Sequence, residues 1–299
     1  MYEYIRSIIP EKRLLFHEPM SRYTTFRVGG EAECIVMVET QEELSRLIPY
    51  LNRSGQDYFV LGNGSNLLVG DKGYQGVILK LSKRMQQIRV QDNHIVAGAG
   101  ALLSQVSVAA RDAGLSGLEF AAGIPGTMGG AIVMNAGAYD GEMKQVVKTV
   151  RVMDREGEIL TLDNDTMEFG YRTSIIRDRP FIVLGVIMEL TMGDKEQISA
   201  RMEELMALRK SKQPLEYPSA GSTFKRPEGY YAGKLIMDAG LRGYRIGGAQ
   251  VSEKHCGFVI NAGGASAADV KEVIEEVQER VKDRFHVRLE PEIIFLGDF

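Results

Sequence analysis

Residues 121–139 read AAGIPGTMGGAIVMNAGAY, and this stretch decides how the rest of the chain is understood. Four of the eight residues 123–130 are glycines. Such a density of glycine indicates backbone that needs a positive φ or that a ligand approaches closely. Thr127 adds a hydroxyl, and the apolar Ile124, Met128 and Ile132 argue against a solvated surface loop. The stretch is therefore typical of a cradle for a diphosphate.

A second small-residue turn lies in LGNGSNLLVG, residues 61–70, directly after the apolar segment 58–62. A strand that runs into such a turn exposes successive backbone N–H groups, which form an anion-binding concavity. Asn63, Ser65 and Asn66 add short hydrogen-bonding side chains. The alternative is a plain turn at a strand end, where Asn-Gly is common. Two such loops in one chain strengthen the case for a ligand of dinucleotide size.

The usual fingerprints of nucleotide and metal sites are missing. Lys234 is followed by Leu235, so no P-loop is present, and neither GNG (62–64) nor GAG (98–100) gains the third glycine of a Rossmann loop. No H-E-x-x-H motif or Cys/His cluster occurs, and no metal site is expected. Ser222 lacks the G-x-S-x-G setting of a serine hydrolase, although residue order does not exclude a Ser-His-Asp triad.

The composition, 44% hydrophobic and 25% charged over 299 residues, is that of a globular protein. A net charge of -4 gives no reason to expect nucleic-acid binding. The longest apolar run, residues 181–190, is too short for a membrane span, and the first 20 residues do not resemble a signal peptide. We therefore expect a cytoplasmic protein without membrane insertion. Cys34 and Cys256 lie in apolar stretches, which favours buried reduced thiols.

The periodicity of apolar residues predicts a mixture of strands and helices. Strands are expected at 33–38, 58–62, 77–81, 94–100, 149–154, 181–190, 257–261 and 288–297. Helices are expected at 41–54, 101–113, 196–210 and 269–285. Thr40 and Glu43 form a capping-box pattern at the start of the first helix. Loop sequence fills 114–141. The order indicates an α+β fold, with a domain boundary near the polar link 191–195.

Several segments together resemble the UDP-N-acetylenolpyruvoylglucosamine reductase family, flavoenzymes of bacterial peptidoglycan precursor synthesis. The matching pieces are YTTFRVGG (23–30), GNGSNLLV (62–69), GIPGTMGG with NAGAY (123–139), GYRTS (170–174), AGSTFKRP (220–227), AGKLI with AGLRG (232–243) and LEPEI (289–293). They occur in this order over nearly the whole chain, which makes the match far more specific than any one motif.

The resemblance implies an α+β architecture with an FAD-binding domain of the PCMH/vanillyl-alcohol-oxidase type, made of two subdomains, and a C-terminal α+β substrate-binding domain. These would occupy residues 21–192 and 193–299, after an N-terminal segment at 1–20. FAD is expected to be noncovalent, because the GNGSN turn has neither His nor Cys. The residues implied to bind it are Gly62, Asn63, Gly64, Ser65, Asn66, Leu67, Gly123, Ile124, Pro125, Gly126, Thr127, Gly129 and Gly130.

The resemblance also implies the reaction. NADPH, the co-substrate, reduces FAD; a hydride then reaches C3 of the enolpyruvyl ether and a proton reaches C2. The family assigns the proton to the Ser of AGS, which is Ser222, and not to Ser219 or Thr223, which are expected to be turn residues. A developing carbanion is basic enough to take a hydroxyl proton, so no histidine is needed. Arg172 and Glu292 would stabilise the negative charge.

Substrate contacts are implied at Tyr139, Lys212 and Lys225. One branch of the family carries a long insertion with a Tyr that closes over the substrate, whereas here only TMGDKEQ (191–197) fills that interval. The chain therefore resembles the shorter branch. The expected partners are the small molecules UDP-GlcNAc-enolpyruvate and NADPH, which would occupy one pocket in turn, and no obligate protein partner is evident.

Two other functions stay open at this point. Another flavoenzyme on the same scaffold, such as an oxidase that passes electrons to oxygen, would keep the FAD loops without needing Arg172, Ser222 and Glu292 together. A nucleotide-sugar-binding regulator would have lost catalysis, although the intact trio of residues argues against it.

Overall fold

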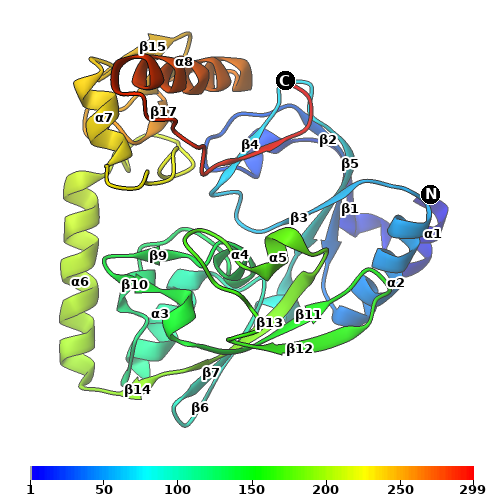
Figure 1. Cartoon of the computed structure of the whole chain (residues 1–299). Helices are drawn as coiled ribbons and strands as arrows, with labels where there is room; N and C mark the ends of the chain where they lie inside the picture. Colours follow the sequence, from blue (N-terminus) through cyan, green and yellow to red (C-terminus); the bar gives the residue numbers. More distant parts are fainter. Residues whose placement is uncertain (1) are drawn as a thin grey trace. The chain divides into compact units, whose positions relative to one another are not determined.

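A computed structural model describes residues 2–299, and the chain divides into two units (Figure 1). Unit 1 comprises Met1–Phe16, Cys34–Asn63 and Gly76–Arg209. Unit 2 comprises His17–Glu33, Gly64–Gln75 and Lys210–Phe299. Within residues 2–299, no helix is long and apolar enough to cross a membrane.

The first sheet of unit 1 forms around a parallel strand pair. β3 (Tyr58–Leu61) lies beside β5 (Tyr74–Leu81), with Leu61 opposite Lys80, and the sheet order is β1 (Leu14–Pro19), β2 (Glu31–Val38), β5, β3. α2 (Gln41–Arg53) precedes β3, and four leucine or isoleucine side chains on one of its faces enter the core. Its predicted capping box is confirmed: Glu43 N donates to Thr40 Oγ1 at 3.2 Å, and Thr40 N donates to the Glu43 carboxylate at 3.4 Å.

The second sheet of unit 1 is antiparallel throughout. Its strand order is β12 (Ile159–Asp163), β11 (Val147–Met153), β13 (Ile182–Glu189), β7 (His94–Gly98), β6 (Ile88–Gln91). α3 (Leu103–Asp112) contacts strands β6 and β7, and α4 (Met128–Val133) contacts β7 and β13 (Figure 1). The glycine-rich stretch leads into α4, so this sheet supports one of the two expected ligand loops.

The remaining elements of unit 1 are short, apart from α6, whose last three residues belong to unit 2. They are α1 (Tyr2–Ile8), η1 (Glu11–Arg13), η3 (Lys83–Gln86), β8 (Leu115–Ser116), η4 (Glu119–Ala121), β9 (Gly137–Ala138), β10 (Gly141–Glu142), η5 (Met143–Gln145), α5 (Ile175–Asp178), β14 (Thr191–Met192) and α6 (Lys195–Lys212). Because only two residues separate the end of β14 from the start of α6, the chain has no room there for the insertion of the longer branch.

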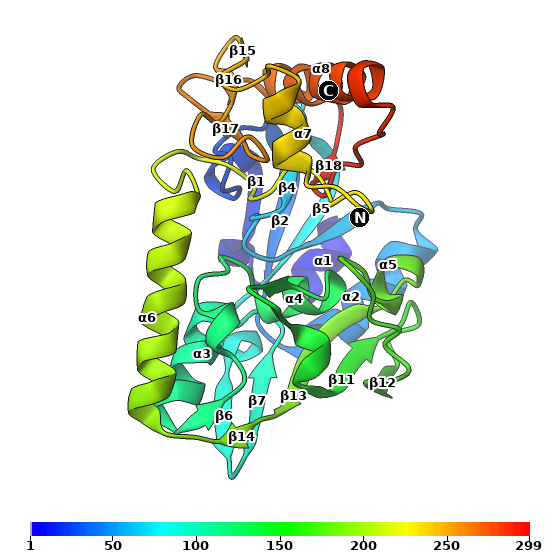
Figure 2. The same cartoon turned by 60° about the vertical axis from the view of Figure 1, so that its left-hand side comes forward.

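Unit 2 has a small antiparallel sheet on which α8 (Ala267–Phe285) packs, and α7 (Ala232–Asp238) contacts α8 (Figure 2). The sheet consists of β15 (Arg245–Ile246), β16 (Ala249–Val251) and β17 (Val259–Asn261). α8 is capped twice, because Ser266 Oγ accepts from Asp269 N at 3.0 Å and Asp71 accepts from Ala267 N and Ala268 N at 2.8 Å each. η2 (Met20–Arg22) also belongs to this unit.

A short parallel pair in unit 2 joins two segments that are far apart in sequence. β4 (Leu67–Val69) follows the GNGSN turn, and β18 (Ile294–Leu296) follows LEPEI, with Leu67 opposite Ile294. The strand predicted over 288–297 is therefore wrong for 288–293, which form no regular strand because their backbone bonds go to loops instead. The long loop predicted over 114–141 is also wrong in part, since it contains α4. Cys34 and Cys256 are free and buried, as predicted.

Candidate active site

The first two residues of the GNGSN turn, Gly62 and Asn63, lie against the glycine-rich loop within unit 1. Asn63 Nδ2 donates to Pro125 O at 2.7 Å, which ties the end of β3 to the glycine-rich loop. A Cβ placed on Gly62 would lie 2.6 Å from Thr127 Oγ1. Gly62 is therefore required by the close approach of these two segments, and the start of the GNGSN turn and the glycine-rich loop form one candidate site.

The glycines of the 123–130 loop serve close packing rather than unusual backbone conformation. None of Gly123, Gly126, Gly129 and Gly130 has a positive φ. A Cβ on Gly129 would lie 3.2 Å from the Ala99 backbone oxygen, and one on Gly123 would lie 2.9 Å from Arg209 Cδ. Of the two reasons for glycine considered from the sequence, the structure supports close approach, although the approaching groups shown are those of the protein.

A cavity of about 100 Å³ opens between the two loops. Its polar side consists of backbone and one hydroxyl, from Gly62, Gly100, Thr127, Gly129 and Gly130. Its other walls are aliphatic or aromatic: Val60, Leu61, Leu81, Ala99, Val133, Ile176, Phe181, Ile182 and Val183. Glycine backbone and a hydroxyl facing an apolar wall fit part of a flavin dinucleotide, which combines polar linking groups with a flat apolar ring.

Lys80 supports this site from β5 and was not foreseen. Its Nζ donates to Gly62 O at 3.0 Å, and burial lowers the pKa of the Lys80 ammonium. The only sequence signal was a lysine within the apolar run VILKL (77–81). Lys80 therefore holds the first residue of the GNGSN turn in place.

Lys80→Met is expected to weaken FAD binding about tenfold, because the loss of one hydrogen bond to a charged donor releases the Gly62 carbonyl. The measurement is the dissociation constant of FAD from the apoprotein, by flavin fluorescence. Lys83→Met is the matched control, since Lys83 is exposed and pairs with Glu39. An unchanged FAD affinity in Lys80→Met would show that the turn holds its shape without this lysine.

Arg172 lies in a tight turn that the rest of unit 1 holds firmly. Gly170 and Thr173 exchange backbone hydrogen bonds, and Arg172 itself has φ +55, a conformation that costs energy outside glycine. The fully buried Asn135 donates from Nδ2 to Gly170 O at 3.0 Å. Arg172 Nη2 donates to Gly137 O at 3.0 Å, two residues before the half-buried Tyr139. Arg172 and the NAGAY segment thus form one connected group.

The three hydroxyls of the AGS region have different environments in unit 2. Thr223 is fully buried, and its Oγ1 accepts a hydrogen bond from Val259 N at 2.8 Å. Ser219 is half-buried, and its carbonyl accepts from Thr25 Oγ1 at 2.6 Å. Ser222 is exposed and follows Gly221, which has φ +77. Because Ser222 is exposed, its hydroxyl is the one that a ligand can reach. No histidine within residues 2–299 is hydrogen-bonded to it.

Glu292 is held by its backbone on both sides. Its N–H donates to Thr223 O at 2.8 Å, next to Ser222. Its carbonyl accepts from Asn66 Nδ2 at 3.0 Å, while Asn66 O accepts from Ile294 N at 2.9 Å. The amide of Asn66 is therefore used to position Glu292. Asn66 at the end of the GNGSN turn, the Ser222 loop and the Glu292 segment form one connected group in unit 2.

The other predicted site residues are placed as follows. Lys225 Nζ lies 3.2 Å from Glu290 Oε2, and its N–H donates to Glu290 O. Gly64 has φ +62, and a Cβ there would collide with Tyr23 O, which explains the need for glycine. Ser65 is half-buried, and Lys212 is exposed at the end of α6. Arg172 and Tyr139 belong to unit 1, whereas Ser222, Lys225 and Glu292 belong to unit 2.

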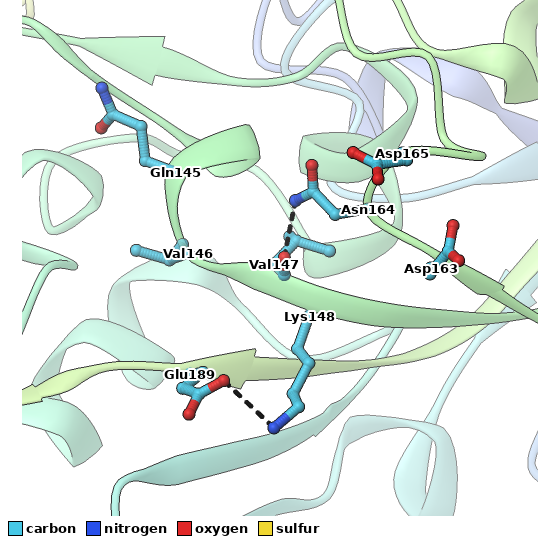
Figure 3. Close-up of a pocket in the computed structure, with 8 residues that line it drawn as sticks. All are labelled: Gln145, Val146, Val147, Lys148, Asp163, Asn164, Asp165 and Glu189. Atoms are coloured by element: carbon cyan, nitrogen blue, oxygen red, sulfur yellow. Dashed lines mark hydrogen bonds and ion pairs between the residues drawn. The ribbon is translucent and has the colours of Figure 1, made fainter.

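A larger hollow of about 460 Å³ lies elsewhere in unit 1 (Figure 3). It is lined by Gln145, Val146, Val147, Lys148, Asp163, Asn164, Asp165 and Glu189, none of which is a predicted site residue. Lys148 and Glu189 form an ion pair at 3.1 Å, and Asn164 Nδ2 donates to Val147 O at 2.6 Å (Figure 3). Because these polar groups partner one another and the hollow is wide open, size alone does not make it a binding site.

Comparison with known proteins agrees with this geometry. Residues 32–163 match the family model of an FAD binding domain, and residues 213–296 match that of the UDP-N-acetylenolpyruvoylglucosamine reductase C-terminal domain. The reductase of Caldanaerobacter subterraneus subsp. tengcongensis is 52% identical, covering 98% of this chain and 97% of that protein. The chain belongs to the UDP-N-acetylenolpyruvoylglucosamine reductase family.

Two further comparisons support the family assignment. The reductase of Agathobacter rectalis is also 52% identical, over 97% of this chain and 96% of that protein. The crystal structure of the Thermus caldophilus reductase has a TM-score of 0.83 and 38% identity, and covers 95% of this chain and 99% of that one. The predicted fold class is confirmed: an α+β FAD-binding domain is combined with the C-terminal domain of this reductase family.

Proposed function

We propose that Arg172, Ser222 and Glu292 perform the reduction for which this family is named. The chain is an FAD-dependent oxidoreductase that uses NADPH to reduce UDP-N-acetylglucosamine enolpyruvate to UDP-N-acetylmuramate, a step of peptidoglycan synthesis. The observation that carries the residue assignment is the connection through Glu292, whose N–H binds Thr223 O beside Ser222 and whose carbonyl binds Asn66 of the GNGSN turn. A proton donor and a carboxyl group are thereby attached to the turn that is proposed to bind FAD.

Bound FAD, once reduced by NADPH, supplies the hydride that the enolpyruvyl group accepts at C3. Ser222 is proposed to donate its hydroxyl proton to C2. An aliphatic hydroxyl stays protonated at neutral pH, yet it can protonate a carbon that carries developing negative charge. The exposed position of the Ser222 side chain leaves it free to meet a substrate, unlike the buried Thr223.

Arg172 and Glu292 are proposed to stabilise the charge that forms before the proton arrives. That charge is shared with the carboxylate of the substrate, so a fixed guanidinium is suited to it. The strained φ of Arg172 and its bond to Gly137 O indicate a residue held in one orientation. A protonated Glu292 would donate a hydrogen bond to the same charge.

The nucleotide sugar is proposed to contact Tyr139, Lys212 and Lys225. Lys225 already pairs with the exposed Glu290 at 3.2 Å, and a substrate anion would exchange with that carboxylate. The domain division proposed for these roles is FAD binding by residues 21–192 and substrate binding by residues 193–299. We further propose that the enzyme works in the cytoplasm, where NADPH is available.

The direct test is turnover of the two substrates by the purified chain loaded with FAD, with no other protein present. NADPH oxidation is expected to depend on UDP-N-acetylglucosamine enolpyruvate, and the product is expected to be heavier by two hydrogens in mass spectrometry. This outcome would also show that no protein partner is required. NADPH oxidation that depends on oxygen and produces hydrogen peroxide, with no effect of the enolpyruvyl compound, would instead favour an oxidase.

A further inference from the structure

Arg209 occupies a position on α6 where the helix pattern calls for an apolar side chain. Ile198, Met202 and Leu205 are the buried residues of α6, at spacings of four and three. Arg209 follows Leu205 by four residues and so continues the same face. It is half-buried, and burial lowers the pKa of its guanidinium. The cationic side chain of Arg209 therefore lies on the face of α6 that carries its buried residues.

The neighbours of Arg209 are the two loops to which ligand contacts are assigned. Its stem lies against Gly123, because a Cβ added to Gly123 would be 2.9 Å from Arg209 Cδ and 3.7 Å from Arg209 Nε. Tyr139 is an electrostatic neighbour of Arg209 and acts to raise the pKa of the guanidinium, against the larger effect of burial. Gly123 thus lacks a side chain where the Arg209 stem passes, so Arg209 lies against the glycine-rich loop and has Tyr139 of the NAGAY segment as an electrostatic neighbour.

Arg209 has no anionic partner of its own. Among residues 2–299, no carboxylate lies within ion-pair distance of its guanidinium, and no acceptor is hydrogen-bonded to it. Arg13, the comparable half-buried arginine of unit 1, is fully used, because both of its terminal nitrogens donate to the Glu43 carboxylate. A guanidinium carries five N–H donors, and those that are withdrawn from water need acceptors. The guanidinium N–H groups of Arg209, which have no acceptor among residues 2–299, therefore indicate an acceptor on a bound ligand.

We propose that Arg209 binds a diphosphate. A planar guanidinium donates two parallel hydrogen bonds to phosphate oxygens, and a site shared with glycine backbone leaves room for them. This inference rests on the proposed function, because it takes the 123–130 loop as an FAD contact and Tyr139 as a nucleotide-sugar contact. Both ligands carry a diphosphate, one in FAD and one in the UDP moiety. Arg209 lies against Gly123, which is assigned to FAD, and has Tyr139, which is assigned to the nucleotide sugar, as an electrostatic neighbour.

The test compares ligands with and without a diphosphate, in Arg209→Met and the wild type; riboflavin also lacks the adenosine of FAD, whereas uridine differs from UDP by the phosphates alone. One arm measures binding of FAD and of riboflavin to the full-length apoprotein. The other measures binding of UDP and of uridine to the FAD-loaded enzyme. Arg209→Met keeps the apolar stem against Gly123 but removes the charge. Loss of bonds to a charged group corresponds to about a 10- to 100-fold weaker binding.

A loss of FAD affinity with unchanged riboflavin affinity supports the proposal and identifies the cofactor diphosphate. A loss of UDP affinity with unchanged uridine affinity supports it and identifies the substrate. Equal losses for a ligand and its phosphate-free counterpart would overturn the proposal, since they indicate a structural role. So would changes below threefold in every case.

The controls separate this proposal from folding and from the reaction. Arg201→Met removes an exposed arginine of the same helix that pairs with Glu204, and it is expected to leave all four affinities unchanged. Arg209→Lys keeps the charge without the fork and is expected to recover part of the lost affinity. Because none of these readouts requires turnover, the proposal can fail while the reductase activity stands, and the reverse also holds.

Discussion

Ser222→Ala is expected to keep its FAD and to be reduced by NADPH at the wild-type rate, while reoxidation by UDP-N-acetylglucosamine enolpyruvate slows roughly 10²–10⁴-fold. The reason is that Ser222 enters the reaction only when C2 needs a proton. Its exposed side chain has no hydrogen bond within residues 2–299, so the substitution should leave the stability of the fold within about 0.5 kcal/mol. Stopped-flow absorbance of the flavin follows both half-reactions separately.

Ser219→Ala is the matched control for this experiment, because it removes a hydroxyl three residues away in the same loop. It is expected to leave both half-reactions unchanged. If Ser222→Ala slowed reduction by NADPH and reoxidation by the same factor, Ser222 would have a structural role. If neither step changed, the proton would come from another group.

The second large effect is expected for Arg172→Met, in which reoxidation by the enolpyruvyl substrate should slow about 10²–10³-fold. Loss of the fixed guanidinium removes charge stabilisation that matters only during hydride transfer to the substrate. Reduction by NADPH should change much less. The variant also loses the hydrogen bond to Gly137 O, which should cost about 0.5–1.5 kcal/mol of unfolding free energy.

Arg179→Met provides the comparison for Arg172→Met, because Arg179 is an exposed arginine seven residues further along the same segment. It is expected to behave as the wild type in both half-reactions. A rate loss in Arg172→Met that is no larger for reoxidation than for reduction would contradict a role in stabilising charge on the substrate.

Much of the fold follows from local patterns. The Thr40–Glu43 capping box marks the start of α2, and the apolar stripes at helical spacing locate α6 and α8 within two residues. The end of the chain is different, because LEPEI has the alternation of a strand but its backbone bonds to Thr223 and Asn66. Those partners are 69 and 226 residues distant, and no local rule predicts them.

The site residues show the same division between local and distant information. The glycine density of 123–130 indicated either a positive φ or close approach of a ligand; none of these glycines has a positive φ, and the groups seen to approach them are Arg209 and Ala99, which are distant in sequence. Lys80 and Arg209 can each be noticed in the sequence in one way: both are charged residues at positions where the pattern of neighbouring apolar residues predicts a buried side chain. The sequence does not show which group accepts the hydrogen bond from such a residue; for Lys80 it is the Gly62 carbonyl.

The most direct measurement of the central claim is a single turnover without oxygen. The enzyme is first reduced with one equivalent of NADPH, and UDP-N-acetylglucosamine enolpyruvate is then added anaerobically. We predict full return of the oxidised flavin absorbance with formation of one equivalent of UDP-N-acetylmuramate. A flavin that stays reduced until oxygen is admitted would contradict the assignment of this chain as a reductase of the enolpyruvyl ether.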